Sequence, residues 1–328
     1  MKKLMQILML LLVLFPIAGY CGDWELMDNP LSNTGVTLDS IWGSGNDDVY
    51  VVGGNVILHF NGRQWRIQSI TLRDFAGVWG SSRHNIYVGG TDIIGQSCGF
   101  GYWFFRPQLD LSNYCFVTRV GGIRRDMLMT GYCYDKGLSS SGGFIIRYSR
   151  LRGPRRVGKS KPTAEYEGMV TLDLPQYGYD GTIYDFWTYD NAAYCVAGDS
   201  GMLKYDGRWL SSIPIDTKGI RAIWGSDLEN VFLVGDAGKV LRCNIKADPP
   251  IVNREIIDTE YDLYDVWGTS PTDVYVLDGW IHHYDGKTWS QMDSGGVVVT
   301  TVRGVPGGDV FAVGPNGTIL RKIESTVN

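Results

Sequence analysis

One short pattern recurs along the whole chain, and this repeat constrains the fold more than any other feature. "IWGSGNDDVYVVGGNVILHFNGRQW" (41–65) returns as "VWGTSPTDVYVLDGWIHHYDGKTW" (266–289). A tryptophan marks five units, at Trp42, Trp79, Trp187, Trp224 and Trp267, and glycine follows it in four of them, whereas Thr188 follows Trp187. A unit without this tryptophan fits 116–135, and a last one has Pro306 at the tryptophan position. The sequence therefore contains seven units, of which the third is lengthened by an insertion.

Each unit has the pattern of four short strands. The first ends at the Trp-Gly pair, and the second is an apolar run that follows an acid or an amide, as in "DDVYVVG". The third and fourth are separated by Asn61-Gly62, Asp206-Gly207 or Asp285-Gly286. These dipeptides predict two-residue hairpin turns in which both central residues have positive φ.

A four-stranded unit of about 40 residues cannot bury both of its faces alone, so it must stack on its neighbours, and radial stacking gives a β-propeller. The last unit stops after "GTILRK", whereas a lone strand-like segment around Trp24 precedes the first. We predict an all-β, seven-bladed β-propeller whose N-terminal strand completes the last blade and so covers the exposed edges. Six or eight blades are alternative counts, and an open β-solenoid is the alternative architecture.

The N-terminus has the features of an export signal. Two lysines precede an apolar run, Ile7–Ala18, that is too short to span a bilayer. The stretch "IAGYC" resembles a lipoprotein lipobox, although Tyr20 departs from it, which makes Cys21 a lipidation candidate. We predict a signal peptide over 1–21, one propeller domain over 22–328, and a location in the periplasm, at the outer membrane or outside the cell. Membrane contact is expected only through a lipid anchor.

An exported chain enters a compartment that permits disulfides. Cys98 and Cys115 flank an expected hairpin, and Cys133 and Cys195 fall at similar places in successive units, so these four are the disulfide candidates. The sequence leaves their pairing open.

Motifs for metals and cofactors are absent from the sequence, so we predict neither. The cysteines and histidines do not have zinc-ligand spacing. His59 and His283 share one place in the repeat, where another unit has Lys204. A position that accepts lysine indicates an exposed strand site.

The pattern "VWG–DVYVVG–G-ILHYDG-TW" resembles the bacterial secreted propellers of the BNR/Asp-box-like group, which includes photosystem II stability/assembly factor-like propellers. "YDGKTW" (284–289) matches the second half of the Asp box. The resemblance implies the fold of nearly the whole mature chain, but no single function, because propellers host many. Some members are sialidases, which need three converging arginines, a Tyr–Glu pair and an acidic Asp. "WRIQ" (65–68) departs from their Arg-Ile-Pro motif, so an enzyme is not the favoured interpretation.

Two sets of charged residues are candidate binding sites. The first recurs at the starts of first strands, near one mouth of the channel: Asp39, Arg73, Asp74, Asp185, Arg221, Asp265 and Arg303. The alternative for this set is surface turns and capping ion pairs.

The second set lies in a basic insertion at about 147–168. This insertion could dock an acidic protein, an anionic glycan or lipid headgroups; the alternative is a solvent-exposed loop without a partner. Its basic residues are Arg147, Arg150, Arg152, Arg155, Arg156, Lys159 and Lys161.

A net charge of −5 argues against a wholly basic nucleic-acid binder. We predict a monomeric, non-catalytic binding or assembly module that presents its irregular segments, 91–101 and 147–168, to a protein or an anionic glycan. The alternative is a glycan-active propeller, either a lectin or a sialidase-like hydrolase, that uses the channel mouth.

Overall fold

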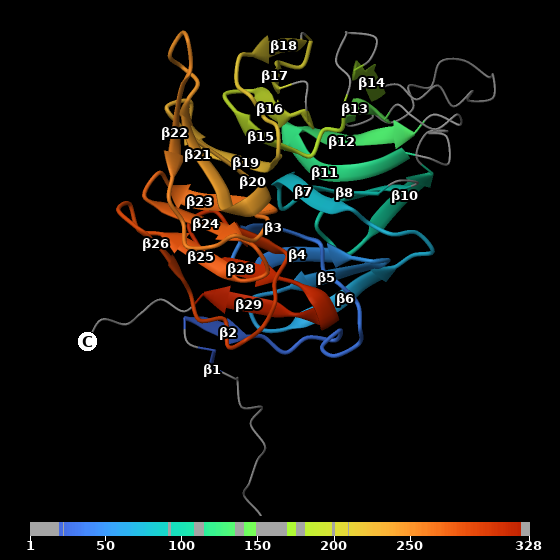
Figure 1. Cartoon of the computed structure of the whole chain (residues 1–328). Coiled ribbons are helices and arrows are strands. Elements are labelled where there is room, and N and C mark those ends of the chain that lie inside the picture. The colour runs from blue at the N-terminus through green and yellow to red at the C-terminus, as the bar shows by residue number, and fades with distance from the viewer. Residues whose placement is uncertain are drawn as a thin grey trace, which may run out of the picture.

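The computed structural model describes residues 20–21, 23–90, 93–107, 115–134, 141–148, 169–174, 181–198, 201–208 and 210–322. These residues form seven antiparallel sheets arranged as the blades of a β-propeller (Figure 1). The predicted seven-bladed, all-β architecture is thus confirmed.

Six blades are formed by consecutive strands. Blade 1 contains β3 (Ser40–Gly45), β4 (Asp48–Gly53), β5 (Val56–Phe60) and β6 (Trp65–Ile70), and blade 2 contains β7 (Gly77–Ser82), β8 (Asn85–Gly89), β9 (Ile93–Ser97) and β10 (Trp103–Pro107). Blade 3 contains β11 (Cys115–Ile123), β12 (Asp126–Tyr134), β13 (Ser141–Tyr148) and β14 (Met169–Asp173), and blade 4 contains β15 (Asp185–Tyr189), β16 (Ala192–Val196), β17 (Met202–Tyr205) and β18 (Leu210–Ile213). Blade 5 contains β19 (Ile220–Asp227), β20 (Asn230–Gly235), β21 (Lys239–Asn244) and β22 (Ile251–Glu255), and blade 6 contains β23 (Asp265–Ser270), β24 (Asp273–Leu277), β25 (Ile281–Tyr284) and β26 (Trp289–Gln291).

Blade 7 joins the two ends of the described chain. Its strands β27 (Thr301–Gly304), β28 (Val310–Val313) and β29 (Ile319–Lys322) are followed in space by β2 (Trp24–Leu26), and β1 (Tyr20–Cys21) pairs outside β2. In the antiparallel β2–β29 pair, Trp24 lies opposite Lys322, and the Trp24 side chain is fully buried. The predicted closure of the ring through the Trp24 segment is therefore present.

The hydrophobic core lies between the blades. Each of seven clusters of buried residues joins two adjacent blades; one packs Tyr50 and Val52 of β4 against Ile86 and Val88 of β8. A second strand is consequently covered on both faces, and every residue of β4 is buried. This explains why the second strands are continuous apolar runs without a polar alternation.

A polar pair bridges the second and third strands of most blades. The acid or amide before each apolar run bonds diagonally to the third strand, as in Asp48–His59 (2.9 Å) and Asn85–Gln96 (3.1 Å), where His59 and Gln96 lie opposite Tyr50 and Tyr87. Asp273–His283 (2.6 Å) repeats the arrangement in blade 6. The predicted exposed position is therefore wrong, because the side chains of His59 and His283 are only 19% and 21% exposed and their rings stack on Tyr50 and Tyr275.

The turns between third and fourth strands also differ from the prediction. Only their glycines have positive φ, at Gly62, Gly207 and Gly286. In the 285–288 turn the Asp285 carboxylate accepts backbone N–H bonds from Lys287 and Thr288. These Asx turns need one residue with positive φ instead of two.

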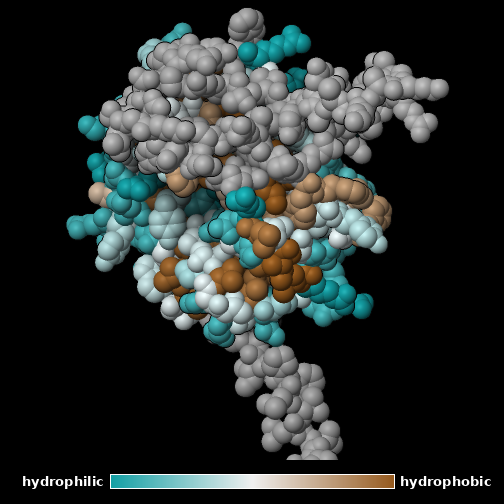
Figure 2. Space-filling view, turned by 90° about the vertical axis from the view of Figure 1, so that its right-hand side faces the viewer, coloured by the Kyte–Doolittle hydropathy of each residue, from teal (hydrophilic) through white to brown (hydrophobic). Residues whose placement is uncertain are grey.

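Part of the segment 91–101, predicted to be an irregular recognition loop, is strand β9 (Ile93–Ser97); residues 91–92 lie outside the described part. Figure 2 shows hydrophobic side chains gathered on the face that carries β6 and β10. Exposed apolar residues of this part of the chain include Ile67, Phe100 and Phe104. Among the described residues no helix is long and apolar enough to cross a membrane.

Candidate functional site: the central channel

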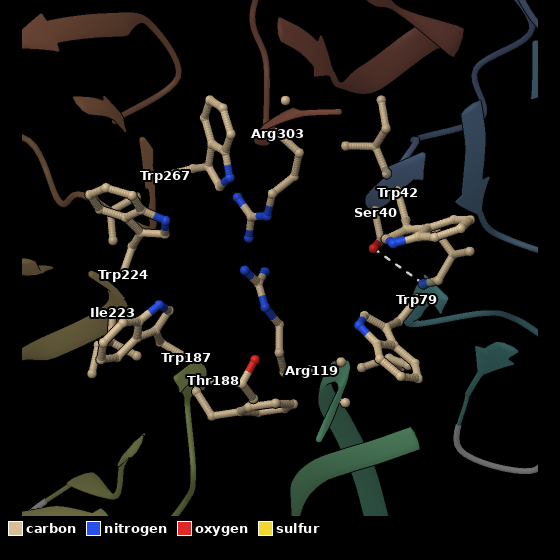
Figure 3. Close-up of a pocket in the computed structure, with 18 residues that line it drawn as sticks. Ser40, Trp42, Trp79, Arg119, Trp187, Thr188, Ile223, Trp224, Trp267 and Arg303 are labelled. Atoms are coloured by element: carbon tan, nitrogen blue, oxygen red, sulfur yellow. Dashed lines mark hydrogen bonds between the residues drawn. The ribbon is translucent and has the colours of Figure 1, made fainter. Parts of the chain in front are cut away.

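The first strands of the blades surround a central channel that contains a cavity of about 280 Å³. Five tryptophans line it, one from each of five blades (Figure 3): Trp42, Trp79, Trp187, Trp224 and Trp267. Arg119 and Arg303 enter from opposite sides, and their guanidinium groups approach each other in the middle of the channel.

The five tryptophans are positioned by glycines of the following blade. A Cβ atom added at Gly80 would lie 2.6 Å from the ring of Trp42, and one at Gly268 would lie 2.8 Å from the ring of Trp224. The same contact joins the other pairs, Trp79 with Gly122, Trp187 with Gly225 and Trp267 with Gly304. The Trp-Gly signature is thus an interlock in which each indole uses the space that a side chain on the next blade would fill.

Two blades break this interlock, and the breaks admit the arginines. In blade 3, Gly121 lies opposite Leu128 at the tryptophan position, and Arg119 precedes it by two residues. In blade 7, Arg303 lies opposite Phe311, as Trp267 lies opposite Tyr275. The sequence assignment of Pro306 to this position is wrong by three residues. Each arginine therefore enters where the tryptophan of the repeat is missing.

The arginines share the channel with two buried carboxylates. Arg119 Nε lies 2.8 Å from Asp185 Oδ1, and its Nη2 lies 3.7 Å from Asp265 Oδ1. Arg303 Nη1 donates to both oxygens of Asp265, at 2.9 and 2.7 Å. Asp185 and Asp265 are only 3% and 2% exposed. The four side chains come from blades 3, 4, 6 and 7, so the network ties distant parts of the ring together.

The carboxylates also fasten adjacent blades. Asp185 Oδ2 accepts a hydrogen bond from the backbone N–H of Ile223 (3.0 Å), and Asp265 Oδ2 accepts one from Val302 (3.0 Å). Ser40 Oγ takes the equivalent bond from Val78 (3.2 Å; Figure 3). All three acceptors stand two residues before the tryptophan of their own blade.

Burial is the main influence on the acidity of both carboxyl groups, because it disfavours the charged form. It raises the pKa of Asp185 against the opposing charge of Arg119. Burial also raises the pKa of Asp265, to about 7, where the negative charge of Asp185 adds to the effect and Arg119 opposes it. The channel thus holds a carboxyl group that titrates near neutral pH.

The groups left free in the channel are hydrogen-bond donors. No hydrogen bond from the indole N–H of the five channel tryptophans is found within the described residues, and Figure 3 shows these nitrogens directed toward the cavity. Arg303 Nη2 is buried and has no partner in the described part of the chain. Indole and guanidinium groups only donate, so the lining is matched to an acceptor.

The structure brings three of the seven predicted mouth residues together: Asp185, Asp265 and Arg303. The exposed Asp39, Arg73 and Asp74 lie before β3 and β7, and exposed Arg221 pairs with Asp236 and Asp262, as the capping alternative predicts. Arg119 and the five tryptophans were not among the site residues predicted from the sequence. The missing tryptophan of the third unit was the available signal for Arg119.

Of the predicted basic set, only Arg147 is described. It lies on β13 and forms an ion pair with Asp126, so it belongs to the repeated polar pairs of the blades. Arg150, Arg152, Arg155, Arg156, Lys159 and Lys161 lie outside the described residues.

Among the predicted cysteines, Cys98 is exposed, Cys195 is buried, and both thiols are free. Cys115 and Cys133 are directly opposite each other in the β11–β12 register. Cys21 lies in β1, opposite Trp24.

The described residues that line the channel do not form a metal site or a sialidase-like site. No group of three or more His, Cys, Asp or Glu side chains that could hold a metal ion occurs in the described part of the chain. The residues that line the cavity include two arginines and no Tyr–Glu pair, so the sialidase constellation is not found there.

Comparison with solved structures supports the fold. The YCF48 structure described as bound to D1 peptide is 13% identical, covers 94% of this chain and 99% of its own, and has a TM-score of 0.66. YCF48 from Cyanidioschyzon merolae is 15% identical over 93% of this chain and 100% of its own, with a TM-score of 0.66. A catalytically inactive virginiamycin B lyase from Staphylococcus aureus with quinupristin is 13% identical over 92% and 100%, with a TM-score of 0.67.

No protein-family model matches the chain, and no curated protein matches its sequence. The likeness to photosystem II assembly factor-like propellers is confirmed for the fold. The chain is a seven-bladed β-propeller.

Proposed function

We propose that this propeller is a non-catalytic binding module that captures a carboxylate-bearing segment of a protein partner in its central channel. The observation that carries the proposal is the lining of the cavity, where five indole N–H groups and two guanidinium groups face one small space. A carboxylate accepts several such bonds at once, and charge-assisted bonds are about twice as strong as neutral ones.

The size of the site fits one part of a partner. A cavity of about 280 Å³ accommodates an acidic side chain or a chain terminus, and not a folded domain. The tryptophans are fixed by the glycine interlock, so the donors need little reorganisation on binding. The remaining affinity would come from contacts of the partner with the face of the ring.

The neighbours support a protein partner. One of the structures with the same fold is described as bound to D1 peptide, and another is a chain of the mitotic checkpoint complex. The basic insertion at 147–168 adds a second surface for an acidic partner in our proposal. We also propose that the chain is exported, with Cys21 as a lipidation candidate, on the N-terminal sequence, and that it belongs to the bacterial secreted, Asp-box-like group, on the repeat and on "YDGKTW" (284–289).

A glycan ligand is the second candidate. It is favoured by exposed tyrosines at the mouth of the channel, where Tyr184 and Tyr264 immediately precede Asp185 and Asp265 and Tyr261 is 70% exposed. Aromatic rings at a rim suit sugar stacking. A lining rich in donors suits a neutral sugar less well than a carboxylate, because sugar hydroxyls also need acceptors.

The test uses the fluorescence of the channel tryptophans during titration with N-acetyl-Gly-Gly and with its C-terminal amide. We expect the free carboxylate to bind and the amide to bind at least tenfold more weakly. Arg119→Gln and Arg303→Gln should each weaken binding about 10- to 100-fold, the value of one charge-assisted bond.

Arg221→Gln is the matched control, because Arg221 lies on the rim with its own acidic partners, and it should bind like the unmodified chain. Equal affinity for acid and amide would reject the carboxylate site. Binding of a sialylated or neutral oligosaccharide in place of both peptides would favour the lectin.

A further inference from the structure

The four charged side chains of the channel cancel one another. Arg119 and Arg303 contribute two positive charges, and Asp185 and Asp265 contribute two negative charges when both are ionised. Asp185 and Asp265 therefore already neutralise the arginine charges that would attract an anionic ligand. A further carboxylate would bring an uncompensated negative charge next to two buried carboxylates, which is costly.

Of the two buried carboxyl groups, Asp265 is the better placed to offset the charge of a bound carboxylate by taking up a proton. Asp265 is approached by Arg303 from β27, by Arg119 from β11 and by the negative charge of Asp185 from β15, and Tyr264 precedes it on the chain. Its remaining contacts among the described residues are the backbone N–H groups of Val302 and Val266. Asp265 thus shares Arg119 with a second buried carboxylate, Asp185. A bound anion would add to the electrostatic repulsion on the Asp265 carboxylate.

Protonation of Asp265 would also release a cation. Arg303 Nη1 gives two of its contacts to the Asp265 oxygens, while Nη2 of the same group has no partner among the described residues. Once Asp265 is neutral, the guanidinium loses its strongest internal competitor and can turn its donors to the ligand. The backbone bond from Val302 can remain, since a protonated carboxyl still has an acceptor oxygen.

We infer that the channel binds its carboxylate together with one proton, which Asp265 takes up from solvent, so that Asp265 is a proton-controlled competitor of the ligand. This inference rests on the proposed function, since it concerns the same site. The balance is simple: the ligand anion and one proton enter, the ion pair between Arg303 and Asp265 gives way to one between Arg303 and the ligand, and the net charge of the channel stays at zero. Because burial already holds the Asp265 pKa near neutrality, the proton is available at little cost around pH 7.

The experiment measures acetate affinity between pH 6 and pH 8.5 by tryptophan fluorescence, at constant ionic strength. Linkage predicts that the dissociation constant rises up to about tenfold per pH unit above about pH 7 and levels off below it. Calorimetry of the unmodified chain in phosphate and in Tris should give an uptake approaching one proton per acetate at pH 8. This readout does not depend on a variant that folds.

Asp265→Asn should bind acetate with an affinity that changes less than twofold across the same range. Asp262→Asn, on the rim, should keep the full pH dependence. If acetate binds with one affinity from pH 6 to pH 8.5 and without proton uptake, the inference is wrong and the binding site stands. If no carboxylate binds at any pH, the proposed function itself fails.

Discussion

The ring of Trp224 lies over Gly268 of the next blade so closely that a methyl group on Gly268 would approach it to 2.8 Å. The same methyl would come within 2.6 Å of the Asp273 carbonyl oxygen. In a unit that carries the Trp-Gly pair, the tryptophan packs on the glycine of the next blade, and the glycine leaves room for the indole of the preceding blade. This relationship explains why the two residues recur together.

Gly268→Ala should destabilise the propeller by about 1–3 kcal/mol, because the new methyl group must displace a ring and a backbone carbonyl in a packed interior. Gly45→Ala is the matched control, since its added methyl would meet only a side-chain oxygen of Asp47 at 3.6 Å. Urea unfolding followed by circular dichroism measures both. Equal stabilities of the two variants would contradict the interlock.

The closing strand offers a second prediction. Trp24 is fully buried and meets Tyr275 edge-on at 6.3 Å, whereas Leu26 on the same strand is 39% exposed. Trp24→Ala should cost about 3–5 kcal/mol, the usual value for a buried tryptophan, and Leu26→Ala less than about 1 kcal/mol. Thermal unfolding distinguishes them. A ring that closes without this strand would tolerate both changes alike.

The polar pairs should be energetically coupled. Burial alone would raise the pKa of Asp48, but the hydrogen bonds from His59 and Ser44 outweigh it, and the pKa is lowered. Asp48→Ala and His59→Ala should each cost about 1–3 kcal/mol, and the double variant should cost less than their sum by about 1 kcal/mol.

Lys204→Ala in blade 4 provides the comparison. Ala192 replaces the acid there and Lys204 lies over the ring of Tyr194, so its loss should cost under about 1 kcal/mol. Additive effects at Asp48 and His59 would show that the two groups stand side by side without stabilising each other.

The repeat made the fold predictable, because a unit with unsatisfied faces has few ways to pack. It predicted the four strands of each unit, the blade count and the role of Trp24. The error at Pro306 arose from spacing along the chain, which turn length alters. Strand pairing assigns the position to Arg303, because only that residue lies opposite Phe311.

The channel could be predicted only in part. Asp185, Asp265 and Arg303 were visible as charges at strand starts, but so was Arg221, which stands three residues before its tryptophan, at a register shift between Ile220 and Ala222, and lies outside the channel. The guanidinium groups of Arg119 and Arg303 reach the middle of the channel. Their position depends on the β11 bulge between Val117 and Arg119 and on the absence of the repeat tryptophan from blades 3 and 7. That depends on register and on neighbours from distant blades, which sequence spacing does not encode.

The last prediction concerns the stability of the unliganded protein. The pKa of Asp265 is about 7 in the folded state and about 3.9 in an unfolded chain, so its contribution to stability is complete below pH 4 and is lost as the pH rises through 7. Asp265→Asn removes this titration. The free energy of unfolding of the variant, minus that of the unmodified chain, should therefore increase between pH 5.5 and pH 8.5, by at most about 1.4 kcal/mol per pH unit.

Urea unfolding at pH 5.5, 6.5, 7.5 and 8.5 gives this difference directly, and it remains meaningful even if the variant is less stable at every pH. Asp262→Asn supplies the reference for an exposed carboxylate on the rim. Parallel curves for the variant and the unmodified chain would place the Asp265 pKa below pH 5.5. Such a result would mean that Arg303 and Arg119 together keep the carboxylate ionised despite its burial, and that the interior charge of the channel does not respond to pH.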